Sequence, residues 1–418
     1  MIDQLAHPEL TATAIVALAA LVCGVVMARL KQPAIVGYIL AGVVLGPSGA
    51  GLVANREAVT TLAEFGVLML LFVVGIELDL RRFIQGWKVA LFVTLVQIAG
   101  SVGTALALRP LLGWSFGLAL VLGFAVAVSS TAVVIKMLES SGDDDSTVGR
   151  VTVGILIAQD IAVVPMMLVL GGVSRAGISP LDAGKVVFSV AFLAALFWLL
   201  VNRRLRLPVT GRLARHVELG PLTALAWCFG AAALSGLMDL SPAYGAFLAG
   251  VVIGNSSQRE SILKSAEPVG NVLLMVFFLS IGLLLDFAFI WKNLGTVLLL
   301  LLMVTLFKTA LNVAALRLTR QDWGAAVLAG AALAQIGEFS FLLAEVGKAN
   351  RLITGAETKL VVAVAVLSLA LSPFWLFTMR RLHRVAEASS LKALLGAVYG
   401  RAALPPPKGP SPRELSDA

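Results

Sequence analysis

Apolar residues form long stretches along the chain, and short polar or charged stretches separate them. A membrane-spanning helix needs about 20 consecutive apolar residues, and windows of this kind recur roughly thirteen times. After about residue 385 the chain turns polar and Pro-rich, which predicts a disordered cytoplasmic tail over 385–418. The pattern therefore predicts an all-α polytopic membrane protein with helices over residues 10–29, 33–48, 60–79, 88–109, 114–138, 148–173, 184–202, 218–238, 242–256, 268–287, 293–316, 323–347 and 356–379.

The composition agrees with a lipid environment. Of 418 residues, 59% are hydrophobic and 13% are charged, whereas about a quarter of the residues of a soluble protein are charged. These values exclude a secreted globular protein. The net charge of +8 is typical of basic cytoplasmic loops in a membrane protein, so we expect lipid and not nucleic acid as the partner. The first ten residues contain no basic segment, and no cleavable signal peptide is expected.

The sequence offers little that would serve enzymatic chemistry. Cys23 and Cys228 lie in apolar runs, and neither a disulfide framework nor a metal site is expected from them. His7, His216 and His383 lie at segment ends and are interpreted as solvated. The spans hold no helical His pair, no Ser–His or Cys–His set and no second close carboxylate on one helix. We therefore expect no enzyme activity and no cofactor.

Basic residues are distributed unevenly between the loops. Loops after odd-numbered helices carry about 16 Lys and Arg residues, against about 8 after even-numbered helices. The positive-inside rule then places the C-terminus in the cytoplasm and the N-terminus outside. At the cytoplasmic end of the third span, Glu77 and Asp79 stand beside Arg81 and Arg82, and we expect an ion-pair cluster there at the membrane surface.

Two parts of the chain are similar to each other. Residues 36–48 align with 244–256 at eight of thirteen positions, and a nearly equal shift of 207 aligns 75–80 with 282–287. The repeat units cover about 33–173 and 242–379, within a transmembrane domain of residues 1–384. Equivalent helices are seven apart, an odd number, so one unit is inverted in the membrane. Inverted repeats are typical of secondary transporters, whose sites lie between the repeats near the bilayer midplane.

Polar residues interrupt three of the spans. The sixth span contains Gln159 and Asp160, and the fifth contains a hydroxyl cluster. The twelfth contains the stretch ALAQIGEFSF, and the shift of 207 aligns Thr131 with Glu338. Helices broken at equivalent positions would leave backbone carbonyls free to face a cation. The polar residues of the fifth span are Ser129, Ser130 and Thr131, and those of the twelfth span, with the glycine beside them, are Gln335, Gly337, Glu338 and Ser340.

Asp160 and Lys308 are the two charges expected deepest in the membrane. Each charge at this depth costs about 2.5–3.5 kcal/mol unless it is paired or hydrated. One interpretation is a structural ion pair; the other, which we favour for Asp160, is an ion site in which Lys308 compensates the charge. Glu338 is either a site residue or a helix end that faces water. The fifth-span hydroxyls either line the site or bond to the preceding turn of their own helix.

A single buried carboxyl can support exchange of a proton for a cation. Burial favours its protonated form, and a nearby cation favours its ionised form. Asp160 is therefore predicted to hold a proton or a metal ion alternately, which is the minimum that antiport requires. Hard alkali cations prefer oxygen ligands, and we expect these from Asp160, Gln159, Ser130, Thr131 and unwound carbonyls.

Seven segments together resemble the Kef-type branch of the monovalent cation:proton antiporter-2 family: KQPAIVGYILAGVVLGPS, AEFGVLMLLFVVGIELDL, SSTAVV, AQDIAVVP, GAFLAGVVIGNS, VFFLSIGLLLDF and QIGEFSFLLAE. The resemblance implies a thirteen-helix homodimer of the bacterial inner membrane, with a fixed dimerisation domain and a moving core domain. It maps the family's acid to Asp160, its polar neighbour to Gln159 and its basic residue to Lys308. Its unwound helices map to 130–131 and 335–337. The Gln-Asp pair resembles potassium-type members, and sodium-type members carry Asn-Asp.

The chain departs from the Kef pattern after its last span. Kef-type systems usually continue into a cytoplasmic nucleotide-binding domain, whereas a short tail without a GxGxxG motif follows here. Nucleotide control is therefore expected only through a separate cytoplasmic regulatory subunit. The sequence predicts a secondary exchanger of K+, or Na+, for protons. The alternatives are an uncoupled channel-like K+ path and a Na+-coupled organic solute carrier, which should carry an unpaired Arg inside a span; none is found.

Overall fold

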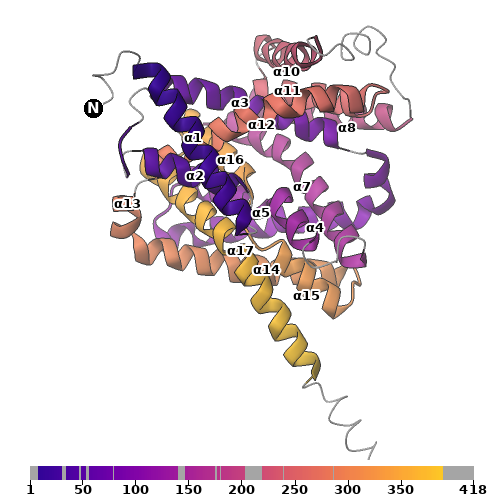
Figure 1. Cartoon of the computed structure of the whole chain (residues 1–418). Coiled ribbons are helices and arrows are strands. Elements are labelled where there is room, and N and C mark those ends of the chain that lie inside the picture. Colours follow the sequence, from indigo (N-terminus) through magenta and orange to yellow (C-terminus); the bar gives the residue numbers. More distant parts are fainter. Residues whose placement is uncertain are drawn as a thin grey trace, which may run out of the picture.

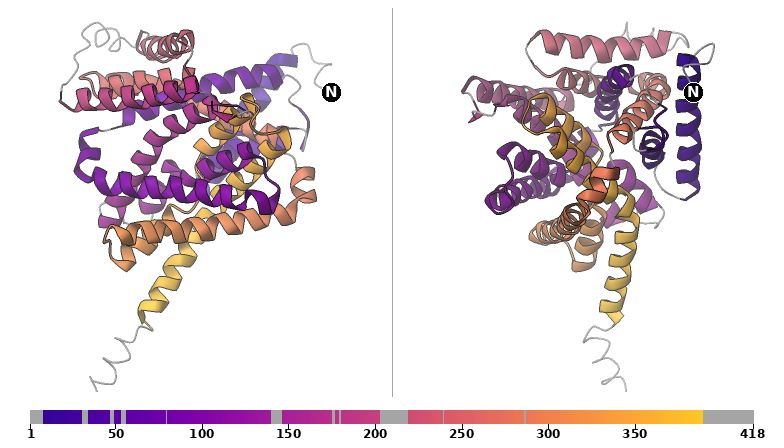
Figure 2. Two further views of the ribbon diagram at one scale, coloured as in Figure 1. Left: turned by 180° about the vertical axis from the view of Figure 1, so that it is seen from behind. Right: turned by 90° about the vertical axis from the view of Figure 1, so that its left-hand side faces the viewer.

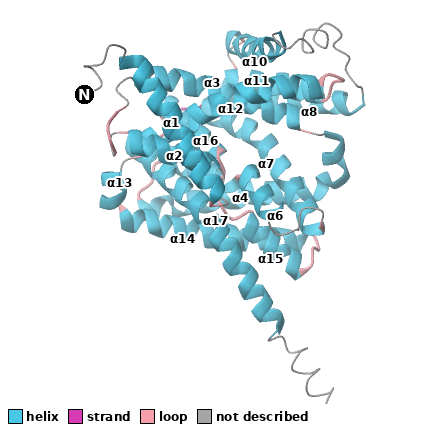
Figure 3. Ribbon diagram, in the orientation of Figure 1, coloured by secondary structure: helices cyan, strands magenta, loops and turns pink. Residues whose placement is uncertain are grey.

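The computed structural model is helical almost throughout (Figure 3). Two short strands, β1 (Val173–Ser174) and β2 (Gly177–Ile178), form one antiparallel pair. The predicted all-α class is thus confirmed, apart from this small hairpin. The structure describes residues 8–30, 34–46, 49–52, 56–78, 80–139, 146–174, 177–178, 180–202, 219–238, 240–285 and 287–388.

Each predicted span has a helical counterpart, and two spans are broken. The fifth span divides into α5 (Phe116–Ala127) and α6 (Thr131–Glu139), and the twelfth into α15 (Trp323–Ala332) and α16 (Phe339–Ala349). The last helix, α17 (Gly355–Ala388), continues a few residues beyond the predicted boundary at 384, and the rest of the predicted tail lies outside the described residues. The other helices are α1 (Pro8–Arg29), α2 (Ala34–Leu45), α3 (Arg56–Glu77), α4 (Leu80–Leu112), α7 (Thr147–Gly172), α8 (Pro180–Asn202), α10 (Leu219–Leu237), α11 (Pro242–Gly254), α12 (Arg259–Leu284), α13 (Phe287–Lys292) and α14 (Leu294–Leu318).

The helices pack as two groups. The first contains α1, α2, α3, α10, α11 and α12, and the second contains α4 to α7 and α14 to α17, with α8 packed beside α4 and α7. In Figure 1, α10, α11 and α12 lie above α4, α14 and α15. The most extensive packing lies within each group, and the groups meet where α2 contacts α17 and α7 contacts α11. Figure 2 shows α1 at the periphery and the end of α17 projecting from the bundle.

The exterior of the bundle is apolar. Large side chains such as Leu237, Trp291 and Trp198 are more than two-thirds exposed, which in water would be unfavourable and in lipid is not. Six of the described helices are long and apolar enough to cross a membrane, and six shorter apolar helices accompany them. The chain is therefore a multi-pass membrane protein.

Two reciprocal glycine contacts hold the first group together. Gly42 on α2 meets Gly282 on α12, and Gly75 on α3 meets Gly250 on α11, so closely that any Cβ would overlap the neighbouring backbone. Small residues let membrane helices approach at backbone distance. Under the shift of the sequence repeat, Gly42 corresponds to Gly250 and Gly75 to Gly282. The two contacts are thus equivalent, as an inverted repeat would require.

We predict that Gly42→Ala destabilises the first helix group. The new methyl group would overlap the Leu279 carbonyl oxygen, and overpacking of this kind costs about 1–3 kcal/mol. The melting temperature of purified protein in detergent should fall. Gly103→Ala is the matched control, because Gly103 lies in a helix with no atom within 4 Å of the new methyl group. Equal melting temperatures for the two variants would contradict the prediction.

Candidate functional site

A cavity of about 800 Å³ lies between the two helix groups. Helices α2, α3 and α12 line one side, and α6, α7 and the start of α16 line the other. Four carboxyl groups face it, and among the described residues that line it none is Lys or Arg. The cavity is therefore suited to a cation. Its polar lining residues are Tyr38, Glu77, Thr131, Asp160, Glu267, Asn271 and Glu338.

Asp160 lies on α7, lines this cavity and is only 8% exposed. The Thr131 hydroxyl donates to its carboxylate, 3.1 Å from Oδ2. Thr131 is the first residue of α6, and the positive end of a helix dipole stabilises a nearby negative charge. The structure thus brings together Asp160 and Thr131 as predicted, with oxygen atoms that open toward the cavity.

The two helix breaks interlock beside Asp160. The Gly337 N–H donates to the Val128 carbonyl at 3.1 Å, and the Ser129 hydroxyl donates to the Leu333 carbonyl at 2.8 Å. A Cβ on Gly337 would lie 2.6 Å from the Ser129 carbonyl oxygen, so only glycine allows this approach. Unwinding leaves backbone groups of both segments without helical hydrogen bonds. These groups find hydrogen-bond partners in the other segment.

Lys308 does not form the predicted ion pair with Asp160. It is 1% exposed, and its Nζ donates at 2.7 Å to the Val128 carbonyl and at 2.7 Å to the Gln335 carbonyl. These carbonyls follow the C-terminal ends of α5 and α15, where helix dipoles are negative. The Lys308 amino group therefore binds the carbonyls of two half-helix ends, and sequence reasoning assigned it the wrong partner.

Gln159 is buried beside Asp160 but does not line the cavity. Its Oε1 accepts the Ser129 N–H at 2.8 Å, and its Nε2 donates to Gln97 Oε1 at 2.8 Å. The predicted role of Gln159 as an ion ligand is not what this conformation shows, because its side chain does not line the cavity. Ser130 likewise does not line the cavity: its hydroxyl accepts the Val133 N–H at 3.4 Å, within its own helix turn.

The second break contributes Glu338 to the cavity. Glu338 precedes α16 and is 7% exposed, and its Oε2 has no hydrogen-bond partner. Gln335 points its Nε2 to the Ser130 carbonyl at 3.3 Å, and its Oε1 also has no partner. Ser340 donates to the Gly337 carbonyl and closes the first turn of α16. Of the polar residues at this break, Glu338 is the one that lines the cavity.

Sequence reasoning missed several residues of this region. It did not single out Glu267 and Asn271, which line the cavity from α12, because the pattern of one helix does not reveal which face meets another group. Glu77 was expected only in the ion-pair cluster at the membrane surface, but it also lines the cavity. Asp79 and the side chains of Arg81 and Arg82 lie outside the described residues, so that cluster stays a prediction.

Two helix groups around a carboxylate-lined cavity, with two broken helices that meet beside a buried Asp, are the architecture of a secondary antiporter. The fold is also that of the sodium proton antiporter MjNhaP1 from Methanocaldococcus jannaschii, with a TM-score of 0.67 at 13% identity, over 88% of this chain and 98% of that chain. At this identity the likeness establishes the fold alone.

Residues 16–381 match the family model "Sodium/hydrogen exchanger, transmembrane". The chain belongs to this family of cation:proton antiporters, as a Kef-type membrane domain. It is 33% identical to K(+) efflux antiporter 5 of Arabidopsis thaliana, over 84% of this chain and 63% of that protein. It is 32% identical to the putative cation/proton antiporter YbaL of Escherichia coli, over 85% and 65%. The chain thus spans less than two-thirds of these two relatives.

Another relative is similar over nearly its whole length. The chain is 70% identical to "Iron transporter MagA" of Paramagnetospirillum magneticum, over 95% of this chain and 92% of that protein. The names of the relatives therefore differ in the cargo that they give, although all share the membrane domain.

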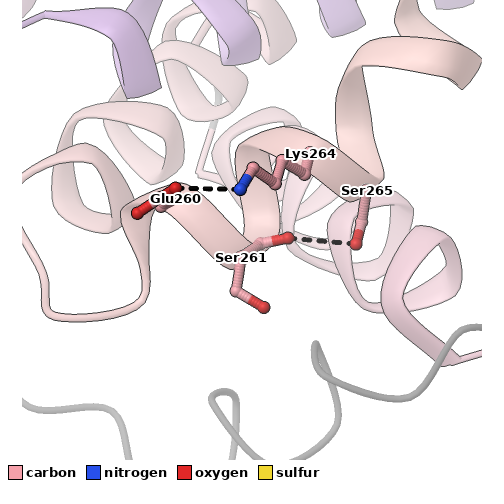
Figure 4. Close-up of polar contacts among 4 residues, drawn as sticks. All are labelled: Glu260, Ser261, Lys264 and Ser265. Carbon is pink, nitrogen blue, oxygen red and sulfur yellow. Dashed lines mark hydrogen bonds and ion pairs between the residues drawn. The ribbon is translucent and has the colours of Figure 1, made fainter.

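We predict that Lys308→Gln lowers the melting temperature while some exchange is retained. The shorter amide side chain cannot keep both hydrogen bonds that Nζ makes, and a buried acceptor left without a donor costs about 1–3 kcal/mol. Lys264→Gln is the control, because Lys264 forms only an exposed pair with Glu260 at 2.8 Å (Figure 4), and such pairs contribute little. An unchanged melting temperature for Lys308→Gln would show that Lys308 does not hold the breaks.

Proposed function

We propose that the chain exchanges a monovalent cation, K+ in preference to Na+, for protons by alternating access. The observation that carries the proposal is Asp160, a buried carboxylate that lines a cavity, with Thr131 as its hydrogen-bond donor and no Lys or Arg among the described residues that line the cavity. Without a fixed counter-ion, the negative charge of Asp160 is neutralised by a cation or a proton from the cavity. Competition between the two at one carboxylate couples their movements.

The orientation predicted from loop charges places the mouth of the cavity at the cytoplasm. Glu77 at the end of α3 and Glu267 near the start of α12 then stand on the cytoplasmic side of Asp160. Carboxylates along a cleft raise the local cation concentration. We therefore propose an inward-facing state of a homodimeric protein in a bacterial inner membrane, with the N-terminus outside. A separate cytoplasmic subunit remains our proposal for its regulation.

The donor chemistry favours an alkali cation. The polar side chains that line the cavity carry carboxyl, hydroxyl and amide oxygens, with no imidazole or thiol among the described lining residues. Hard cations prefer oxygen, whereas transition metals bind well to imidazole and thiolate. Among the residues that the structure describes, no group of three His, Cys, Asp or Glu side chains could hold a metal ion. Potassium is preferred over sodium because of the Gln159–Asp160 pair and the K(+) efflux relatives. The name of the MagA relative makes Fe2+ the second candidate cargo.

Two other functions predict different behaviour. A channel-like path would pass cations without proton coupling, so a pH gradient would not drive cation accumulation. A carrier of organic anions should place an unpaired Arg in the cavity, and none is found among the described lining residues.

We predict that Asp160→Asn and Asp160→Ala abolish exchange. Both variants remove the only carboxylate at which, in our proposal, a proton and a cation compete. The measurement is cation-driven proton flux in proteoliposomes with a pH-sensitive dye. Glu345→Gln is the control, because Glu345 forms only a half-exposed pair with Lys348. Near-normal exchange by either Asp160 variant would contradict the proposal.

We also predict a cargo order in the same assay. K+ and Na+ added in turn to wild-type proteoliposomes should release internal protons, K+ at the lower concentration, and Fe2+ under reducing conditions should release none. Proton release by Fe2+ that Asp160→Asn abolishes would instead assign iron as the cargo. Cation flux without any proton release would favour the channel.

A further inference from the structure

Three buried amide side chains form a continuous hydrogen-bonded chain through the second helix group. Gln159 on α7 donates to Gln97 on α4 at 2.8 Å, and Gln97 donates to Asn312 on α14 at 2.9 Å. None of the three is more than 1% exposed. We call Gln97, Gln159 and Asn312 the amide relay.

Backbone groups fix the direction of the relay at both ends. At one end the Ser129 N–H donates to Gln159 at 2.8 Å, and at the other Asn312 donates to the Gly330 carbonyl at 3.1 Å. Turning any one amide would place nitrogen against nitrogen and oxygen against oxygen. Since an N–H can only donate and a carbonyl can only accept, each amide has one allowed orientation.

The relay joins the two broken helices beside the bonds of Lys308. Ser129 belongs to the first break, and Gly330 to α15, which leads into the second. Asn312 lies four residues after Lys308, so both project from one face of α14. Lys308 holds the carbonyl side of the breaks, whereas the relay holds the Ser129 N–H, two residues before Thr131.

Stability alone does not account for three amides in this position. Replacing all partners of a buried hydrogen-bond network by apolar groups of similar shape is often close to neutral in stability. A fully satisfied network instead imposes one arrangement on its surroundings. The arrangement here is that of the Ser129–Thr131 segment, whose Thr131 hydroxyl reaches Asp160.

We propose that Gln97 and Asn312 are positioning residues: through Gln159 they fix the Ser129–Thr131 segment and so set how tightly the site of Asp160 binds its cation. Gln159 then acts on cation preference by orienting the break, not by ligating the ion. This inference rests on the proposed cation exchange at Asp160.

The test uses shape-conserving variants of the full chain. Gln97→Met and Asn312→Leu interrupt the relay, and Gln159→Met removes its contact with the break. The matched control is Thr94→Val, because Thr94 is buried on the same helix one turn away and its hydroxyl has no hydrogen-bond partner. Proteoliposome exchange gives the KM for K+, the K+ to Na+ preference and the maximal rate of each variant, and detergent melting gives the stability.

We expect Gln97→Met and Asn312→Leu each to raise the KM for K+ by on the order of 10-fold, the effect of about one lost hydrogen bond, and to change the preference for K+ over Na+. Thr94→Val should leave both unchanged. In a Gln159→Met background, Gln97→Met should add less than about twofold, because its effect passes through Gln159. A change in melting temperature alone, or equal effects of Gln97→Met in both backgrounds, would overturn the proposal.

A second readout does not depend on transport. In a Cys23→Ser/Cys228→Ala background, Thr131→Cys reports the position of residue 131 through its labelling rate with a water-soluble thiol reagent. We expect Gln97→Met to change this rate at least about threefold, as an altered local opening would, and Thr94→Val to leave it unchanged. An unchanged rate with Gln97→Met overturns the relay, whereas a changed rate together with no cation exchange by the wild-type chain refutes the proposed function alone.

Discussion

The contact of one ammonium group with two carbonyl oxygens supports the whole centre of this protein. Lys308 donates to Val128 and Gln335 at 2.7 Å each, and these two residues are separated by the shift of 207 that relates the repeats. Unwound backbone inside a membrane is tolerated only where its polar groups find partners. The amino group of Lys308 satisfies one such group in each repeat unit and so links the two breaks.

Because Lys308 is engaged by the backbone, Asp160 is left without a fixed cation among the described residues. Its carboxylate has the Thr131 hydroxyl and the N-terminal end of α6 as its nearest stabilising groups, and the cavity in front of it is lined by further carboxyl groups. The structure separates two tasks: buried donors and acceptors maintain the shape of the breaks, and the Asp160 carboxyl group is left open to the cavity, where in our proposal a proton or a cation binds it. An ion pair between Asp160 and Lys308 would have joined these tasks and reduced the attraction for a transported cation.

The sequence predicted the helices and breaks that follow from local pattern. It did not predict features that depend on how distant segments pack against each other. Each apolar window has a helical counterpart among the described residues, and polar residues inside three of these windows located both breaks and Asp160. The partner of Lys308 could not be predicted, because a free carbonyl has no signature in the sequence. Gln97 and Asn312 did give a signal, since each is an amide in the middle of an apolar span, but that signal was outweighed by the charged residues. The face of α12 that carries Glu267 depends on how two helix groups meet, and one helix alone does not determine it.

The division into two helix groups has a consequence for inhibition. The walls of the cavity belong to both groups, with α2, α3 and α12 on one side and α6 and α7 on the other, while the groups share little direct packing. A molecule that filled the cavity and adhered to both walls would act as a wedge. In the alternating-access cycle proposed above, it would prevent one wall from moving relative to the other, without any need to resemble a cation or to touch Asp160.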